Sequence, residues 1–238
     1  MLTATDLSIG YHKDKALLSG ITFTAGAGQL ILLLGINGIG KSTLLRTLCG
    51  LLPPVGGQVQ IDGRDTSALV PQDRAKLISG VFTGRDFDPY ITIRELVTLG
   101  RYPYTDWAAR LSPTDTAAID RAIGIAGIGH LAGKRINQVS DGERQKALIA
   151  KSIAQDTPVI IMDEPTAFLD YKNKAELLRT IRMLATDHGK TVLLSTHDIA
   201  AALPYSDRAL LIAESGTFHE AAGAALEEAS LKNYMETH

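Results

Sequence analysis

The sequence of 238 residues predicts an α/β domain with a mostly parallel central sheet and an inserted helical subdomain. Short apolar runs alternate with helical segments, which is the βαβ pattern of a parallel sheet. From Asp86 to about Val139 there is no strong strand signal, and glycine and proline divide the chain into helices. We therefore expect one domain over residues 1–238, with a helical subdomain at about 86–155.

Six apolar runs are predicted to form strands. Three of them contain Ile31–Leu34, Val159–Met162 and Val192–Leu194, stretches without any polar residue. Uninterrupted apolar runs of this kind are typical of central strands that are covered on both faces. The six predicted strands are Leu30–Gly35, Gln58–Asp62, Ile78–Thr83, Val159–Met162, Thr191–Ser195 and Ala209–Ala213.

Helices are expected between these strands and within the subdomain. In the subdomain the stretches TIRELVTLG, SPTDTAAIDRAIGIAGI and HLAGK are read as helices broken by glycine and proline. The final stretch, AAGAALEEASLKNYMETH, has the pattern of a short amphipathic helix that ends the domain. The remaining predicted helices are Lys41–Cys49, Ser140–Ala154, Lys172–Asp187 and Asp198–Leu203.

The composition narrows the class of protein. Hydrophobic residues make up 45% of the chain and charged residues 21%, which is ordinary for a globular protein. The net charge of −2 provides no basic footprint, so no nucleic-acid partner is expected. The single cysteine, Cys49, excludes an internal disulfide, and its apolar neighbours indicate packing. The first residues lack the pattern of a secretory signal, and the apolar runs are too short to span a membrane.

The stretch GINGIGKSTLL, which begins at Gly35, fits the phosphate-loop pattern Gly-x4-Gly-Lys-Ser. Glycines allow successive backbone N–H groups to turn toward phosphate oxygens, and the helix that begins near Lys41 adds its positive end. Lys41 would then neutralise charge on the β- and γ-phosphates, while the Ser42 hydroxyl would be a ligand of Mg²⁺. The alternative is a glycine-rich turn capped by serine, and the next motif weighs against it.

A second motif, VIIMDEPTAFLD, brings two adjacent carboxylates to the end of an apolar strand. Asp163 lies at the carboxyl end of that strand, where ligands bind in such sheets, and is a natural partner for the Mg²⁺ held by Ser42. Glu164 can polarise a water in line with the γ-phosphate. The alternative is an acidic turn before Pro165. The stretch LLSTHD repeats the layout with His197, although a histidine at a strand end is often structural.

Together with the stretch VSDGERQKALIAKSIAQDTPVIIMDEP, these motifs resemble those of the ATP-binding cassette (ABC) ATPases over nearly the whole chain. The resemblance implies a P-loop NTPase core with an N-terminal antiparallel β portion. It also implies a head-to-tail homodimer, in which the signature motif that begins at Ser140 covers the ATP held by the partner's phosphate loop. Ser140 and Glu143 also form a capping-box pattern, and this local role is compatible with the first.

The resemblance implies roles for individual residues, with ATP and Mg²⁺ as the bound groups. Catalysis would involve Glu164 as the base, with Lys41 and His197 stabilising the transferring phosphoryl group. Ser42, Asp163 and Thr83 are the implied metal-site residues. Tyr11 matches the aromatic that stacks on adenine, although an exposed turn tyrosine is the alternative. The other implied nucleotide contacts are Gly35, Asn37, Gly38, Gly40, Lys41, Ser42, Thr43, Ser140, Gly142 and Asp170.

Two positions depart from the pattern of the family. Thr83 stands where glutamine is usual, and its shorter side chain favours a water-bridged rather than a direct contact with Mg²⁺. Asp141 stands where glycine is usual, and its carboxylate would repel a phosphate unless it turns outward, toward Arg144 or the partner subunit. We expect nucleotide binding to survive both changes, with hydrolysis or coupling retuned.

Within the family, the stretches ITIRELVTLGRYPYTDW and ARLSPTD resemble the ATPases of importers for iron–siderophore, haem and cobalamin complexes. Thr92 and Glu95 are expected to cap a helix there. Arg101, followed by Tyr102 and Tyr104, is predicted to be an exposed hot spot that docks on a membrane permease.

The implied partners are a second copy of the chain, two membrane permease subunits and, indirectly, a substrate-binding protein. The implied location is peripheral, on the cytoplasmic side of the bacterial inner membrane. The rival interpretations are an exporter ATPase, a soluble cassette protein such as one for cluster assembly, and a P-loop kinase. The signature motif at Ser140 argues against the kinase.

Overall fold

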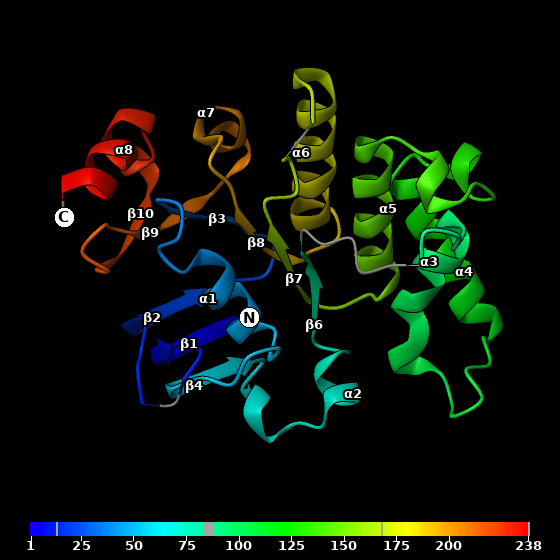
Figure 1. The fold of residues 1–238 in the computed structure, drawn as a ribbon, viewed down its shortest axis with the longest axis horizontal. Helices are drawn as coiled ribbons and strands as arrows, with labels where there is room; N and C mark the ends of the chain where they lie inside the picture. Colours follow the sequence, from blue (N-terminus) through cyan, green and yellow to red (C-terminus); the bar gives the residue numbers. More distant parts are fainter. Residues whose placement is uncertain (13, 83–87, 168, 238) are drawn as a thin grey trace.

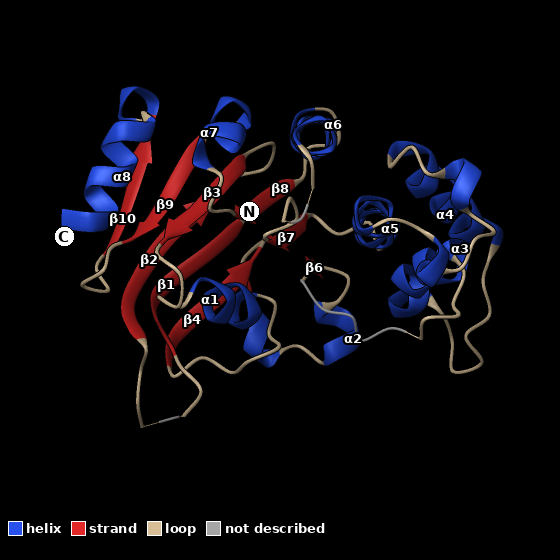
Figure 2. Cartoon of the chain, turned by 45° about the horizontal axis from the view of Figure 1, so that its top comes forward, coloured by secondary structure: helices blue, strands red, loops and turns tan. Residues whose placement is uncertain are grey.

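A computed structural model describes residues 1–12, 14–82, 88–167 and 169–237 of the chain. Its centre is a six-stranded sheet with the order β10-β9-β3-β8-β7-β6. All neighbouring strands in it are parallel except β10, which runs antiparallel to β9 (Figures 1 and 2). The strands are β3 (Leu30–Gly35), β6 (Ile78–Val81), β7 (Val159–Asp163), β8 (Thr191–Ser195), β9 (Arg208–Ile212) and β10 (Phe218–Ala222).

A second, antiparallel sheet is built mainly from the N-terminal part of the chain, in the order β2-β1-β4-β5. Its strands are β1 (Leu2–Ile9), β2 (Leu18–Ala25), β4 (Gly56–Ile61) and β5 (Arg64–Asp65). Figure 1 shows this sheet beneath the parallel one, with α1 (Lys41–Leu48) beside it. The predicted α/β class, with its mostly parallel sheet and its antiparallel N-terminal portion, is confirmed.

Two apolar layers cover the parallel sheet, one on each face. Ile31, Leu33, Val159, Ile161 and Leu193 pack with α1 and the antiparallel sheet. The alternate residues of the same strands pack with the helices on the opposite face, α5 (Asp141–Ala154) and α6 (Tyr171–Thr186) among them. Because both faces are buried, these strands need no polar alternation, which is the pattern that predicted them.

The chain between β6 and β7 is helical in its described part, and Figure 1 shows its helices to the right of the sheet. It contains α3 (Ile93–Thr98), α4 (Pro113–Ile125) and α5. Each helix begins with a capping box, and those at Thr92–Glu95 and Ser140–Glu143 were expected from the sequence. Short 3₁₀ helices occur at Thr66–Ala68, Leu99–Tyr104 (η2), Gly129–Leu131, Ile136–Gln138, Leu203–Tyr205 and Gly223–Ala225.

The remaining helices are α2 (Pro71–Arg74), α7 (Ile199–Ala202) and α8 (Glu228–Thr237). The predicted C-terminal helix was placed too early, because the helix begins only at Glu228 and is preceded by β10. Strands β1, β2, β5 and β10 were not identified from the sequence. In the described residues, no helix is both long enough and apolar enough to cross a membrane.

Candidate active site

The turn between β3 and α1 is shaped by its glycines. Gly38 and Gly40 have φ angles of 81° and 115°, which side chains with a Cβ rarely adopt. A Cβ on Gly35 would lie 2.8 Å from the backbone oxygen of Ile212, on the neighbouring strand β9. The backbone therefore follows a path open to glycine, and this path leads directly into the N-terminus of α1.

Lys41 lies inside this turn and is only 6% exposed. Its Nζ donates to the backbone oxygens of Gly35, at 2.7 Å, and Ile36, at 3.0 Å. Burial lowers the pKa of the ammonium, while the charges of Glu164 and Asp163 act in the opposite direction. The fold thus brings the lysine of the turn close to the two carboxylates at the end of β7, and the ammonium could exchange carbonyl oxygens for those of a phosphate.

Asp163 ends β7 and is only 5% exposed. The hydroxyl of Ser195, at the end of the adjacent strand β8, donates to its Oδ1 at 2.6 Å. The same hydroxyl accepts the backbone N–H of Glu164 at 2.9 Å, and the backbone oxygen of Ser195 accepts this N–H at 3.2 Å. One side chain therefore fixes both the carboxylate of Asp163 and the start of the turn that carries Glu164.

Glu164 has a left-handed backbone conformation, with a φ of 48°. This conformation is strained for a residue with a Cβ, and residues with such strain are common at functional sites. Its Oε2 lies 3.2 Å from Nδ1 of His197, which follows β8 and has a side chain 58% exposed. The two predicted catalytic side chains are thus in contact beyond the carboxyl ends of β7 and β8.

Tyr11 is exposed, and its phenol oxygen accepts a hydrogen bond from Thr43 at 3.1 Å. This contact connects the predicted adenine-stacking residue to the first turn of α1. Ser42 and Asn37 are both exposed at the same end of the helix. Their side chains are therefore open to a ligand, and Thr83, the third predicted metal-site residue, lies outside the described residues.

The residues of the signature motif line a different part of the surface. Ser140 caps α5. The carboxylate of Asp141 forms an ion pair of 2.6 Å with Arg144, which is one of the two outward orientations predicted from the sequence. A groove of about 510 Å³ is lined by Ser140, Gly142 and Asp170, among other residues. In the part of the chain that the structure describes, no residue of the phosphate loop, Glu164 or His197 lines it. A single chain thus separates the predicted site residues into two groups.

Asp170 caps α6 and accepts hydrogen bonds from the backbone N–H of Asn173, at 2.8 Å, and from its side-chain amide, at 2.9 Å. The backbone bond is the largest cause of the lowered pKa of this carboxyl. Gly142 is tightly packed, because a Cβ there would lie 3.2 Å from the side chain of Leu169. The groove is therefore shaped by the packing of α5 against the residues that lead into α6.

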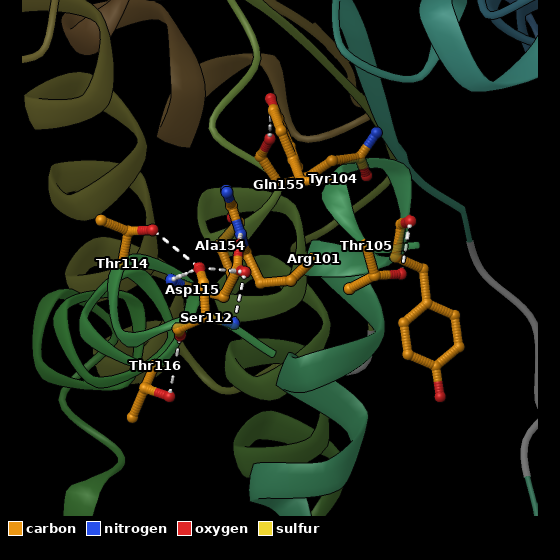
Figure 3. Close-up of polar contacts among 10 residues, drawn as sticks. Arg101, Tyr104, Thr105, Ser112, Thr114, Asp115, Thr116, Ala154 and Gln155 are labelled. Atoms are coloured by element: carbon orange, nitrogen blue, oxygen red, sulfur yellow. Dashed lines mark hydrogen bonds and ion pairs between the residues drawn. The ribbon is translucent and has the colours of Figure 1, made fainter. Parts of the chain in front are cut away.

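The prediction that Arg101 is exposed is wrong. Only 8% of the residue is exposed, and its guanidinium forms an ion pair with Asp115 in which Nε lies 2.9 Å from Oδ1 (Figure 3). Charged residues are rarely buried without a partner, and here the partner comes from the next helix, α4. Tyr102 is 50% exposed. Arg101 itself cannot be a docking residue in this conformation.

Sequence reasoning missed Ser195. Its hydroxyl is the link between Asp163 and Glu164, and the residue is fully buried. The available signal was a serine at the end of a predicted strand, two residues before the candidate His197. The register of β7 against β8, which pairs Asp163 with Ser195, is what gives that serine its role.

The chain has the defining features of the P-loop NTPases. A glycine-rich turn leads from a parallel strand into a helix, and a buried lysine lies beside carboxylates at the edge of the sheet. The sequence profile of the ABC transporter family matches residues 18–167, and the chain belongs to this family. The predicted family is therefore confirmed, and the chain is an ATP-hydrolysing cassette.

Curated relatives match over most of the chain. The achromobactin transport ATP-binding protein CbrD of Dickeya dadantii (strain 3937) is 34% identical over 232 residues, which cover 97% of this chain and 86% of CbrD. The hemin import ATP-binding protein HmuV of Bordetella avium is 35% identical over 231 residues, which cover 94% and 87% of the two chains. The chain is therefore similar to these transport subunits along nearly its full length.

Among solved structures, the chain is similar to the dimeric, post-hydrolysis structure of the ATP-binding cassette MJ0796 bound to ADP and Pi. The TM-score is 0.80 at 26% sequence identity, and the match covers 93% of this chain and 98% of that one. The neighbour shows that a cassette of this fold holds the products of ATP hydrolysis within a dimer.

Proposed function

We propose that this chain is the ATPase subunit of an importer for an iron chelate, such as a siderophore or haem, or for cobalamin. The proposal draws on the transport of achromobactin and the import of hemin, for which CbrD and HmuV are named. Two copies would close around two ATP molecules, and the motion would act on two membrane permease subunits served by a substrate-binding protein. The chain would be peripheral, on the cytoplasmic side of the bacterial inner membrane.

The observation that carries the proposed mechanism is the separation of the site into two groups of residues. Lys41, Asp163 and Glu164 lie together, whereas Ser140 and Asp170 line a separate groove. Within one chain, the two groups do not line a common groove, although Ser140 and Asp170 are exposed while Lys41 and Asp163 are buried. In a head-to-tail dimer, the groove of one copy would face the phosphate loop of the other. The dimeric MJ0796 cassette provides a precedent for two cassettes around bound nucleotide.

The phosphate loop would bind the triphosphate of ATP through Gly35, Asn37, Gly38, Gly40 and Thr43, with Tyr11 against the adenine. Lys41 already donates to two carbonyl oxygens of the loop, so its ammonium can move to phosphate oxygens without a new desolvation cost. Ser140 and Gly142 of the partner, at the positive end of α5, would contact the γ-phosphate.

The residues fit a magnesium ion. Ser42 offers an exposed hydroxyl and Asp163 a carboxylate oriented by Ser195, and oxygen donors of this kind are those that Mg²⁺ prefers. The ion would neutralise charge on the β- and γ-phosphates. The place of Thr83 in this site stays a prediction.

Glu164 would orient and deprotonate the attacking water. Its contact with Nδ1 of His197 fixes the carboxylate from one side, and the turn anchored by Ser195 fixes it from the other. His197 would also face the transferring phosphoryl group, where a donor stabilises developing charge. Opening of the dimer after hydrolysis would pass motion to the permease through the proposed helical subdomain, residues 86–155 of the single domain.

The test is the substitution Glu164→Gln, which keeps the shape of the side chain and removes its basicity. A general base contributes about 10²–10⁴-fold to a rate, so we expect phosphate release to fall by about that factor while ATP binding is retained. Glu227→Gln, an exposed substitution outside the site, is the control and should leave both quantities unchanged. Retained turnover in Glu164→Gln would reassign the base.

The same variant tests the shared pocket, because an ATP-bound cassette that cannot hydrolyse should remain a dimer in light scattering. A strictly monomeric Glu164→Gln protein at saturating magnesium and ATP would refute the two-copy mechanism. The transport role is tested by reconstitution with the permease, where ATPase activity should rise on addition of the cognate chelate and its binding protein.

A further inference from the structure

The C-terminal turn of α5 is held by η2, the segment that contains Arg101. A Cβ on Gly100 would overlap the backbone oxygen of Lys151, so the two segments lie in direct backbone contact. The hydroxyl of Tyr104 donates to the backbone oxygen of Gln155 at 2.9 Å. The segment η2 therefore packs closely against the end of α5, and at Gly100 there is no room for a side chain.

Arg101 ties three elements together at this point (Figure 3). Its Nη1 donates to the backbone oxygen of Ala154, the last residue of α5, at 2.8 Å, while its Nε pairs with Asp115 of α4. The guanidinium carbon lies 3.9 Å from the centre of the Tyr104 ring. Ser112 in turn donates to the carboxylate of Asp115, so the pair is fixed from both ends. A cation at the C-terminus of a helix also complements its dipole.

The same turn of α5 is joined to the central sheet. The hydroxyls of Ser152 and Ser79 are 2.6 Å apart, and both residues are buried. The amide of Gln155 donates to the backbone oxygen of Ala75 at 2.6 Å. Since Ser79 belongs to β6, the end of α5 is one of the places where the helical region is joined to the sheet.

The opposite end of α5 carries Ser140. The helix has 14 residues, which corresponds to a rod about 21 Å long. Over that length, a tilt of about 5° at the joint displaces Ser140 by about 2 Å. A displacement of about 1 Å in a reacting site can cost about 10²-fold in rate.

We propose that Arg101 is a positioning residue for ATP hydrolysis. By holding the C-terminal turn of α5 between η2 and α4, it acts together with the packing of α5 on the core to fix the direction of the helix, and hence the place where Ser140 meets the nucleotide of the partner copy. The inference rests on the proposed role of Ser140. It means that Arg101, a buried and ion-paired residue at the other end of α5, affects the rate of ATP hydrolysis.

The test replaces the ion pair without leaving a lone buried charge, in the double variant Arg101→Met/Asp115→Leu. Exchange of a buried pair for apolar residues of similar volume is often neutral for folding. We expect its ATP affinity to match that of the wild type, because the phosphate loop lies elsewhere, and its kcat to fall at least tenfold at a temperature where the protein is folded. Its unfolding temperature should fall, because the backbone N–H and the hydroxyl of Ser112 lose the carboxylate of Asp115 as their acceptor. A loss of kcat in the folded protein with unchanged ATP affinity distinguishes positioning from a general loss of structure.

The matched control is the pair Arg94 and Asp120, which joins α3 to α4 at 2.6 Å and is solvent-exposed. Arg94→Met/Asp120→Leu should leave kcat unchanged. Tyr104→Leu is a second test variant, because it removes the ring beneath the guanidinium and the bond to Gln155 while the ion pair remains. It should lower kcat in the same direction, and it keeps the proposal testable if the double variant does not fold.

Ser140→Arg, assayed in parallel, tests the proposed role of Ser140 separately from the proposed role of Arg101. Full activity of Ser140→Arg would refute the role of the signature residue on which the inference rests. Loss of activity in Ser140→Arg, together with wild-type kcat in the folded Arg101→Met/Asp115→Leu and Tyr104→Leu proteins, would overturn the inference alone.

Discussion

Ser195 connects the two carboxylates of the site, and Ser195→Ala tests that connection. The substitution removes the 2.6 Å hydrogen bond to the buried carboxylate of Asp163. The backbone N–H of Glu164 loses the serine hydroxyl but keeps the backbone oxygen at 3.2 Å, so no buried donor is left without an acceptor. The loss therefore reduces to one hydrogen bond to a charged group, worth about 1.5–3 kcal/mol.

For a chain of this size, 1 kcal/mol lowers the unfolding temperature by about 2–4 °C, so Ser195→Ala should lower it by about 3–12 °C. Loss of a side chain that orients a metal-binding carboxylate typically costs about 10–100-fold in metal affinity or activity. We expect kcat to fall by that factor at saturating magnesium and ATP. The assays are thermal unfolding by calorimetry and release of inorganic phosphate.

Thr191→Val is the matched control for Ser195→Ala, because it removes a buried hydroxyl at the other end of β8. That hydroxyl donates at 2.9 Å to the backbone oxygen of Gly26, a neutral acceptor that precedes β3, whereas Ser195 lies at the carboxyl end of β8. A neutral bond is worth about 0.5–1.5 kcal/mol, and kcat should not change. If the unfolding temperature of Ser195→Ala lies less than about 3 °C below that of the wild type, the lower limit of the expected fall, and its kcat is unchanged, the proposed link is refuted.

Three further predictions concern the thiol, the helical joint and acid stability. Burial raises the pKa of Cys49 to about 12, so Ellman's reagent at pH 8 should label the only cysteine after unfolding and not before; rapid labelling of the native protein would contradict this. Gly100→Ala should destabilise the protein by about 1–3 kcal/mol through overlap with the Lys151 oxygen, and an unchanged unfolding temperature would disprove that contact. The pKa of Asp115 is lowered, and the largest cause is the hydrogen bond from the hydroxyl of Ser112. The Asp115 carboxylate therefore stabilises the folded protein above the unfolded pKa of about 3.9, and this stabilisation is lost as pH falls through the lower folded pKa. The stability difference between wild type and Asp115→Asn should therefore shrink on acidification, and a constant difference from pH 6 to pH 2 would exclude this linkage.

The central strands could be predicted because their physical cause is local. Leu30–Gly35 and Val159–Asp163 are buried on both faces, and an uninterrupted apolar run records that burial in the sequence itself. The same holds for the phosphate loop, where the glycines, Lys41 and Ser42 are contiguous and act through the backbone around them. Strands β1 and β2 were missed because irregularities in their pairing break the alternation of apolar and polar residues that marks a half-buried strand: the register shifts between Ala4 and Leu7, and the buried residues Leu18 and Ile21 are three apart.

The sequence by itself determined the family, the order of the central strands along the chain and the placing of Asp163, Glu164 and His197 at or just after their carboxyl ends. Only the tertiary structure decided that Arg101 is buried, because its partners, Asp115 and the backbone oxygen of Ala154, lie 14 and 53 residues away. It also decided that Ser195 holds Asp163, through the register of two parallel strands, and that Ser140 lies apart from the phosphate loop. The physical reason is that motifs encode local backbone geometry, whereas the burial of a charge and the direction of a helix depend on distant segments.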